Sequence, residues 1–326
     1  MPPPLVTNIY TADPSAHVFN NRIYVYPSHD RETKIPFNDR GDQYDMVDYH
    51  VLSMDRVGAS TTDHGIAMRM EDVKWVKKQL WAPDCARGND GRFYLYFPAR
   101  DHEGIFRIGV AVSDKPEGPF TPDREPIPGS FSIDPASFVD EDGSSYLYFG
   151  GIWGGQLQCY SSPSGGTFDP SQDGPHEPSG PGVKALCPRV GKLSADMHTF
   201  DGPVQEIVIL DENGQPLLAD DHERRFFEAS WMHKKDGVYY FSYSTGDTHF
   251  IVYATSTSPT GPFTYQGKIL EPVVGWTTHH SIVEHEGKWW LFYHDCELSK
   301  GVSHLRSVKV REIKYDEQGK IITETP

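Results

Sequence analysis

The sequence has little of what marks metal-cluster, disulfide-rich or membrane proteins. Its 326 residues include only four cysteines, Cys85, Cys159, Cys187 and Cys296, which are far apart and form no Cys-x-x-Cys pair. This spacing favours free buried thiols over a disulfide framework or a zinc site. No uninterrupted apolar stretch is long enough to span a bilayer. We therefore expect no membrane partner.

Basic residues are also scarce. The chain has 30 Lys and Arg against 46 Asp and Glu, a formal net charge of −16. Nucleic-acid backbones bind to basic surfaces, so nucleic acid is not an expected partner. The N-terminus, MPPPLVTNIY, has neither the basic nor the apolar region of a signal peptide. We expect a cytoplasmic protein, or a secreted one if a signal peptide has been removed.

Long helical patterns are missing as well. Aromatic residues make up 13% of the chain, which also contains 30 glycines and 26 prolines. Short aromatic-rich runs are broken at regular intervals by turn residues. This pattern predicts an all-β architecture.

One phrase, an acid followed by a turn and an aromatic strand, recurs along the chain. Its copies read DPSAHVFNNRIYVYP, DCARGNDGRFYLYFP, DPASFVDEDGSSYLYFG, EASWMHKKDGVYYFSYS and HHSIVEHEGKWWLFYHD. An Asn-Asn, Asp-Gly or Glu-Gly turn leads each time into alternating large residues, which is typical of a hairpin. The alignment makes five aromatic residues equivalent: Tyr24, Tyr94, Tyr146, Tyr240 and Trp290.

A second repeat, SDKPEGPFT, SSPSGGTFDP and TSPTGPFTY, follows the expected third strands GVAVS, LQCYS and IVYATS. Each unit is therefore a small antiparallel sheet, with insertions around residues 30–46 and 169–226. Such sheets can stack radially, and the sequence predicts one five-bladed β-propeller domain over residues 1–326. The spacing is too long for a β-helix, and a β-sandwich would not require this repeat. The segments VTNIY and VKVREIKYD are expected to share a blade and close the ring.

The residues that open the copies should meet in the central channel of a propeller. They are Asp13, Asp84, Asp134, Glu228 and His279. Such a ring of acids is costly unless a function or a cation compensates for it. We interpret Asp84, in WAPDC, as a structural residue. A functional role is favoured for the other three acids, since three unrelated turn caps would have to fall at one phase of the repeat.

A pocket of carboxylates and aromatic residues suits a sugar, because aromatic faces stack on sugar rings and acids bond their hydroxyls. Inverting hydrolysis needs one carboxylate that activates water and one carboxylic acid that protonates the leaving oxygen. A third acid nearby would raise the pKa of the proton donor.

The ordered motifs resemble glycoside hydrolase family 43, whose fold is a five-bladed β-propeller, over essentially the whole chain. The resemblance implies that Asp13, in ADPS, is the general base and that Asp134, in SIDPASFVDEDG, modulates the pKa of the acid and orients it. Glu228, in FFEASW, would be the general acid. Many members have Glu-Gly-Pro where this chain has Glu-Ala-Ser, which we interpret as a subgroup difference.

The resemblance also implies a calcium ion in the channel, held by one histidine and mostly by water. His279 is the expected ligand, and His280 is the alternative. Trp81 resembles a stacking residue of the innermost subsite, and Arg306 resembles an arginine that reaches a sugar hydroxyl or an acid. Three further residues are expected at the rim or facing the pocket: Phe37, His249 and Asp30.

The implied function is an inverting exo-acting glycoside hydrolase that releases xylose from the non-reducing end of xylo-oligosaccharides, with α-L-arabinofuranosidase activity as an option. The two insertions are expected to wall the channel off into a pocket. Three alternatives stay open: an α-L-arabinofuranosidase or arabinan-active enzyme of the same family, a retaining fructan or sucrose hydrolase, and a non-catalytic carbohydrate-binding propeller.

Overall fold

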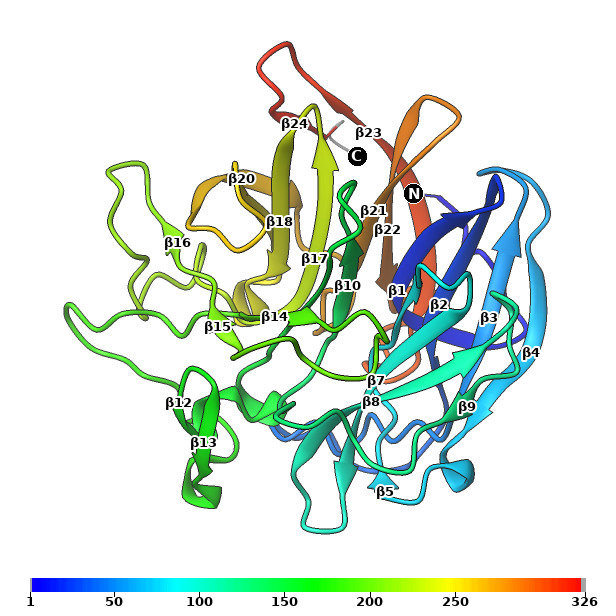
Figure 1. The fold of residues 1–326 in the computed structure, drawn as a ribbon, viewed down its shortest axis with the longest axis horizontal. Coiled ribbons are helices and arrows are strands. Elements are labelled where there is room, and N and C mark those ends of the chain that lie inside the picture. Colours follow the sequence, from blue (N-terminus) through cyan, green and yellow to red (C-terminus); the bar gives the residue numbers. More distant parts are fainter. Residues whose placement is uncertain (1, 324–326) are drawn as a thin grey trace.

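Five sheets surround a central channel in the computed structural model, which describes residues 2–323 (Figure 1). The chain colours in Figure 1 follow one another around this channel, so that the last blade adjoins the first. Regular structure other than β-strand is limited to five short 3-10 helices in the described residues. The five-bladed β-propeller is therefore confirmed.

The first two blades each continue outward from an innermost strand. Blade 1 contains β1 (Tyr10–Phe19), β2 (Arg22–Asp30), β3 (Asp48–Met54) and β4 (Thr62–Arg69). Blade 2 contains β6 (Asp84–Arg87), β7 (Phe93–Asp101), β8 (Phe106–Ser113) and β9 (Thr121–Pro122), and β5 (Val76–Lys78) pairs with the end of β7.

The other three blades follow the same plan. Blade 3 contains β10 (Ala136–Val139), β11 (Ser145–Phe149), β14 (Arg189–Leu193) and β15 (Gln205–Glu206). Blade 4 contains β17 (Glu228–Lys235), β18 (Val238–Ser244), β19 (Ile251–Ser256), β20 (Phe263–Leu270) and β16 (Ile209–Leu210). Blade 5 contains β21 (His280–His285), β22 (Lys288–Asp295), β23 (Ser307–Tyr315) and β24 (Ile321–Ile322).

The helices are single turns that lie between strands. They are η1 (Met70–Asp72), η2 (Trp153–Gly155), η3 (Leu157–Cys159), η4 (Pro170–Gln172) and η5 (Gly246–Thr248). Within residues 2–323, none of the helices has the length and apolar character needed to cross a membrane.

The third strand of blade 3 differs from the prediction. The segment LQCYS forms η3 and the start of β12 (Tyr160–Ser162), which pairs only with β13 (Gly165–Phe168). β14 takes the expected place beside β11. The reason is local, because a left-handed Gln156 lies between η2 and η3 and interrupts extended chain there.

The two ends of the described chain close the ring as expected. The Leu5 amide donates to the Val308 carbonyl at 2.8 Å, and the Thr11 amide donates to the Arg306 carbonyl at 2.9 Å. The N-terminal segment therefore runs beside β23. The four cysteines are free thiols, as expected.

Candidate active site

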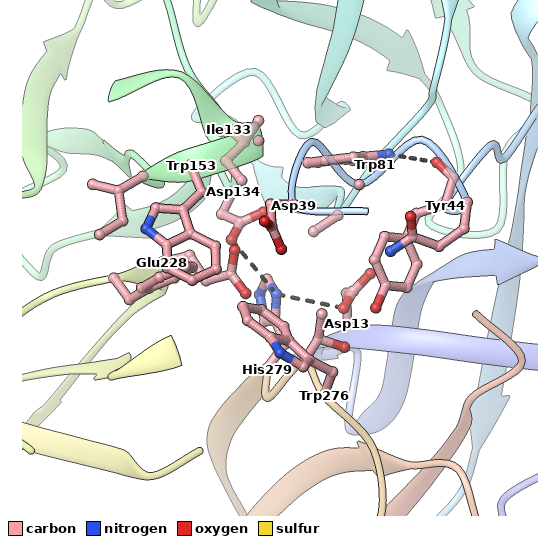
Figure 2. A pocket seen from close by; sticks show the side chains of 18 of the residues that line it. Asp13, Asp39, Tyr44, Trp81, Ile133, Asp134, Trp153, Glu228, Trp276 and His279 are labelled. Atoms are coloured by element: carbon pink, nitrogen blue, oxygen red, sulfur yellow. Dashed lines mark hydrogen bonds and ion pairs between the residues drawn. The ribbon is translucent and has the colours of Figure 1, made fainter. Parts of the chain in front are cut away.

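Two aspartates lie where the pairing of the innermost strands is interrupted: Asp13 within β1 and Asp134 two residues before β10. Asp13 has φ 49° and Asp134 has φ 56°, both in the left-handed region that aspartate tolerates better than most residues. In β1 this break is a register shift between Ala12 and Ser15. Such a bulge turns a side chain away from the regular alternation of the strand. Both carboxylates line the pocket in Figure 2.

Glu228 and Asp13 occupy positions that differ by one residue when the strand pairing of their blades is compared. The prediction that they are equivalent is therefore wrong. Glu228 pairs with Ser244 in β18, which is the place that Ala12 takes in β1. The left-handed residue of β17 is Ala229, with φ 61°. The bulge here follows the acid, yet Glu228 still faces the pocket (Figure 2). Two different positions on similar bulges therefore supply the acids.

Asp84 is out of phase by two residues and lies deeper in the channel. It pairs with Tyr96, which is the place that Ser15 takes in β1. Its fully buried carboxylate contacts His17 Nε2 at 2.6 Å and accepts the Ser137 hydroxyl at 2.6 Å. Asp84 therefore ties three blades together, which agrees with its interpretation as a structural residue.

Asp13 is surrounded by groups that stabilise its ionised form. Arg306 Nη1 donates to Oδ1 at 2.8 Å, and the Ser28 hydroxyl donates to Oδ2 at 2.7 Å. Burial, the largest single influence, would raise the pKa of Asp13, but Arg306, the two neighbouring histidines and Ser28 together outweigh it, and the pKa falls to about 2. Burial lowers the pKa of His279 to about 4 and that of His294 to about 3, so both rings are neutral near pH 7. The permanent charge beside Asp13 is therefore that of Arg306.

Asp30 is the residue that fixes Arg306, and it does not line the pocket. Arg306 Nε and Nη2 each donate to an Asp30 oxygen at 2.8 Å, and its backbone amide donates at 2.9 Å. The guanidinium also lies 4.8 Å from the centre of the Tyr44 ring. The expectation that Asp30 faces the pocket is wrong, because this bidentate pair buries the carboxylate behind Arg306.

Glu228 has the opposite environment. Among the described residues, no hydrogen bond or ion pair within 4.0 Å reaches its carboxylate. Burial raises the pKa of Glu228 to about 8, and repulsion by the Asp13 charge acts in the same direction. A carboxyl group in this setting keeps its proton near neutral pH.

Asp134 is coupled to Glu228. Burial, followed by repulsion from Glu228 and Asp13, raises the pKa of Asp134 well above its usual value. The Ala229 amide donates to Asp134 Oδ2 at 2.8 Å, which favours the ionised form. The pKa of each acid is therefore raised, and ionising both at once is costly.

His279 lies between the two aspartates. Its Nδ1 is 3.7 Å from Asp13 Oδ1 and 3.9 Å from Asp134 Oδ2 (Figure 2). His280, the alternative ligand, is fully buried and contacts the Ser242 hydroxyl at 2.6 Å, outside the pocket lining. Of the two histidines, only His279 is therefore in a position to hold an ion in the pocket.

Aromatic rings form part of the wall of the pocket, whose volume of about 620 Å³ includes space open to solvent. Trp81 and Phe37 line it as expected, and Phe37 is 51% exposed at the rim. The Trp81 indole donates to the Tyr44 carbonyl at 2.6 Å. Gly41 lies against this indole, since a Cβ there would be 2.7 Å from the ring. The glycine lets the loop close over Trp81.

The two insertions contribute differently. The segment between β2 and β3 supplies several lining residues, from Phe37 to Met46, so the first insertion walls the pocket as expected. The insertion at 169–226 supplies none, so that expectation is wrong. Its Glu177 instead lies 3.2 Å from buried Arg225. Arg225 also donates to the Thr245 carbonyl at 3.0 Å and so anchors the chain that enters β17.

His249 lies behind the pocket wall, and the expectation that it faces the pocket is wrong. It is not among the lining residues. Its Nδ1 is 2.8 Å from the Trp276 carbonyl, and the two rings meet edge to face at 5.8 Å. A left-handed backbone at His249, φ 61°, turns this side chain toward Trp276. His249 therefore positions an aromatic wall residue.

Several lining residues had no signal in the repeat. Trp153 begins η2 after β11, Trp276 lies in the loop before β21, and their rings are 5.7 Å apart. Tyr44 and Asp39 belong to the first insertion. His294, in β22, is outside the pocket lining and accepts the Asp13 amide at 3.0 Å. The tryptophans had one usable signal, because each adjoins a glycine-containing turn at the channel end of a blade.

Comparison with known proteins agrees with this geometry. The family model described as "Glycosyl hydrolases family 43" matches residues 4–168 and 189–321. Xylosidase/arabinosidase 43A of Humicola insolens is 71% identical over 326 residues, covering 99% of both chains. A xylosidase/arabinosidase of Bacteroides ovatus is 55% identical, covering 98% of this chain and 96% of its own.

Solved structures give the same result. CoXyl43, a GH43 β-xylosidase/α-arabinofuranosidase from a compost microbial metagenome, was solved with xylotriose in a calcium-free form. It superposes with a TM-score of 0.96 at 57% identity, covering 99% of this chain and 97% of its own. A GH43_1 enzyme from Xanthomonas citri complexed with xylose gives 0.92 at 53% identity, covering 99% and 93%. The chain belongs to glycosyl hydrolases family 43 and is a glycoside hydrolase.

Proposed function

We propose that this protein is an inverting, exo-acting β-xylosidase whose pocket also accepts α-L-arabinofuranosyl groups. The relatives named above as xylosidase/arabinosidase support the substrate class. The observation that carries the mechanism is the contrast between Asp13, whose pKa is about 2, and Glu228, whose pKa is about 8. Two carboxyl groups held in opposite protonation states are what single-displacement hydrolysis requires.

In this mechanism Asp13 is the general base. Its ionised carboxylate removes a proton from a water molecule as the water oxygen bonds to the anomeric carbon. Glu228 donates its proton to the glycosidic oxygen as the bond between that oxygen and the anomeric carbon breaks. Attack from the face opposite the leaving group inverts the anomeric configuration. Exchange with solvent then removes the proton from Asp13 and returns one to Glu228.

Asp134 is proposed to set the pKa of Glu228 and to orient it. The bond from the Ala229 amide stabilises negative charge on Asp134, and in this mechanism the proton is placed on Glu228 while Asp134 is ionised. Ala229 follows Glu228 directly, and this bond therefore also fixes the backbone from which the acid projects. Loss of the Asp134 charge would lower the pKa of Glu228 and leave less of the acid protonated.

The pocket shape supports exo action. The loop with Phe37 and Tyr44 closes one side, and Trp81 forms a wall on which a sugar ring can stack. Trp153 and Trp276 add further stacking surfaces. Xylopyranose and arabinofuranose can present similar hydroxyl patterns, which allows one such pocket to accept both.

His279 is the proposed protein ligand of a calcium ion in the channel. Its neutral ring lies near the two aspartates, but three of their four carboxylate oxygens already accept hydrogen bonds, from Arg306, Ser28 and the Ala229 amide. Since calcium takes six to eight oxygen ligands, the residues fit only an ion that keeps most of its water. The positive charge of such an ion would offset the charges of the nearby carboxylates.

Proton NMR of the first products from an aryl β-xyloside tests the proposal. We expect α-xylose to appear first and to mutarotate later; initial β-xylose would show a retaining enzyme. A parallel panel with aryl arabinofuranoside, arabinan and sucrose separates the remaining alternatives. Hydrolysis of sucrose or arabinan without hydrolysis of xylosides would contradict the proposal, as would full turnover by Glu228→Gln.

A further inference from the structure

Two histidine–aspartate pairs lie side by side in blade 1, outside the pocket. His29 on β2 contacts Asp48 on β3, with Nδ1 and Oδ1 2.5 Å apart. His50 on β3 contacts Asp63 on β4, with Nδ1 and Oδ1 2.9 Å apart. The two imidazole centres are 4.4 Å apart. None of the four residues lines the pocket, so the proposed hydrolysis does not use them.

The first three of these residues can present ligand atoms to one point. One atom each from His29, Asp48 and His50 can be chosen so that all three lie within 4.8 Å of one another, and no other trio of such side chains in residues 2–323 meets this condition. The set offers two imidazole nitrogens and one carboxylate oxygen. Calcium and magnesium prefer oxygen ligands, whereas zinc and its neighbours bind imidazole well.

Charge and access agree with a cation. Within the described chain, neither Asp48 nor Asp63 has a lysine or arginine within 4.0 Å. The four side chains are 10 to 23% exposed, so an ion could enter from solvent and still be shielded. Asp63 bonds Nδ1 of His50 and leaves Nε2 as the free ring nitrogen. A carboxylate behind a histidine in this way is the usual support of a metal ligand.

We propose that His29, Asp48 and His50 bind one zinc-like divalent transition-metal ion, with Asp63 orienting His50. This site is separate from the proposed calcium site at His279. It also adjoins the active site through the backbone, because Ser28 and Asp30 flank His29 and contact Asp13 and Arg306. A bound ion would therefore brace β2 where that strand supports the general base.

Calorimetric titration of chelator-treated protein with Zn²⁺, in buffer containing excess Ca²⁺, tests this inference. We expect one equivalent of Zn²⁺ to bind and the melting temperature to rise. His50→Asn and His29→Asn should each abolish the binding. Asp63→Asn should weaken it about 10- to 100-fold. Co²⁺ in place of Zn²⁺ should give a visible absorption band that the His29→Asn variant lacks.

His198→Asn is the matched control, because His198 contacts Asp123 at 2.6 Å through the same ring nitrogen but belongs to no such trio. This variant should bind Zn²⁺ as the parent does. Circular dichroism confirms that each variant is folded, and the more exposed His29 serves if His50→Asn unfolds. The inference is overturned if the parent binds no Zn²⁺. It is equally overturned if binding survives His29→Asn, or is lost in His279→Asn instead.

Discussion

Blades 1 and 4 each contribute a carboxyl group to the pocket, Asp13 and Glu228, and the surroundings of the two groups shift their pKa values in opposite directions. In blade 1, Asp13 accepts hydrogen bonds from a guanidinium and a hydroxyl, and its pKa is about 2. In blade 4, Glu228 receives no such bond from the described residues, and its pKa is about 8. The strands that carry the two acids are similar. The difference comes from what the neighbouring elements place beside them.

Ring closure supplies the decisive neighbour. Arg306 directly precedes β23, and its carbonyl accepts the Thr11 amide at 2.9 Å. The contact that joins the ends of the propeller therefore also brings a guanidinium to Asp13. No lysine or arginine among residues 2–323 lies within 4.0 Å of the Glu228 carboxylate. A closed ring of similar blades thus becomes an asymmetric site.

Replacing either acid should have the largest effect on activity. On xylobiose, Asp13→Asn and Glu228→Gln should each lower kcat by about 10²–10⁴-fold, the usual contribution of general acid–base catalysis. On a dinitrophenyl xyloside, Glu228→Gln should recover most of this loss, because that leaving group departs without a proton. Asp13→Asn should not recover. Steady-state kinetics with both substrates measures the difference, and recovery by Asp13→Asn would reverse the assignment.

Replacing the neighbour of Asp13 should have the next largest effect. Arg306→Lys keeps a positive charge but loses the bidentate bond to Asp30, so the charge is no longer held against Asp13. We expect kcat/KM to fall about 100-fold, as for other displaced catalytic groups. The pKa of the acid limb in the pH–rate profile should rise toward 3.8. A profile identical to that of the parent would show that Arg306 does not set the ionisation of Asp13.

The pH dependence of the free energy of unfolding should reflect the opposite pKa shifts of Glu228 and Asp13. The folded-state pKa of Glu228 is raised from 4.5 to about 8. The folded state therefore binds a proton that the unfolded chain has lost, and the free energy of unfolding falls as pH rises between these values. Asp13, lowered from 3.8 to about 2, adds stability above 3.8 that is lost as pH falls through 2. In urea unfolding, Glu228→Gln should flatten the decline toward pH 8, and an unchanged slope would contradict the account.

The rim should matter least. Phe37→Ala removes an exposed ring that touches none of the three acids, and we expect KM for xylobiose to rise a few-fold with kcat nearly constant. This corresponds to about 1 kcal/mol for one aromatic contact. His249→Asn, which leaves Trp276 less supported, should have a similar or smaller effect. A large fall in kcat in either variant would place these residues closer to the reaction than the structure does.

The fold was predictable because its signals are local and repeated. Turn dipeptides followed by alternating aromatic residues marked the hairpin of each blade, as at Tyr24 and Tyr240. Which residue of each strand faces the channel was less predictable. The β-bulge in β17 shifts Glu228 by one residue relative to Asp13, and the spacing of the repeats does not reveal this shift. The third strand of blade 3 was missed because an insertion separates β14 from β11 in the sequence.

Site residues that lie within a sequence motif were predictable. Residues whose place depends on contacts with distant parts of the chain were not. Asp30 ends β2 and pairs with the innermost strand β1, yet its bidentate bond to Arg306 buries it. His249 was expected to face the pocket, but its left-handed backbone directs the side chain behind Trp276. Contacts between residues this far apart in sequence form only when the ring closes, so the sequence pattern does not predict them.

The central claim is that Glu228 holds a proton at neutral pH while Asp13 does not. Carbon-13 NMR of protein labelled at the side-chain carboxyl carbons, followed through pH, measures this directly, and the signals lost in Glu228→Gln and Asp13→Asn give the assignments. We expect the signal of one glutamate carboxyl carbon to titrate near pH 8 and the signal of one aspartate carboxyl carbon to show an ionised group down to about pH 2. A Glu228 signal that titrates at its ordinary value near 4.5 would contradict it.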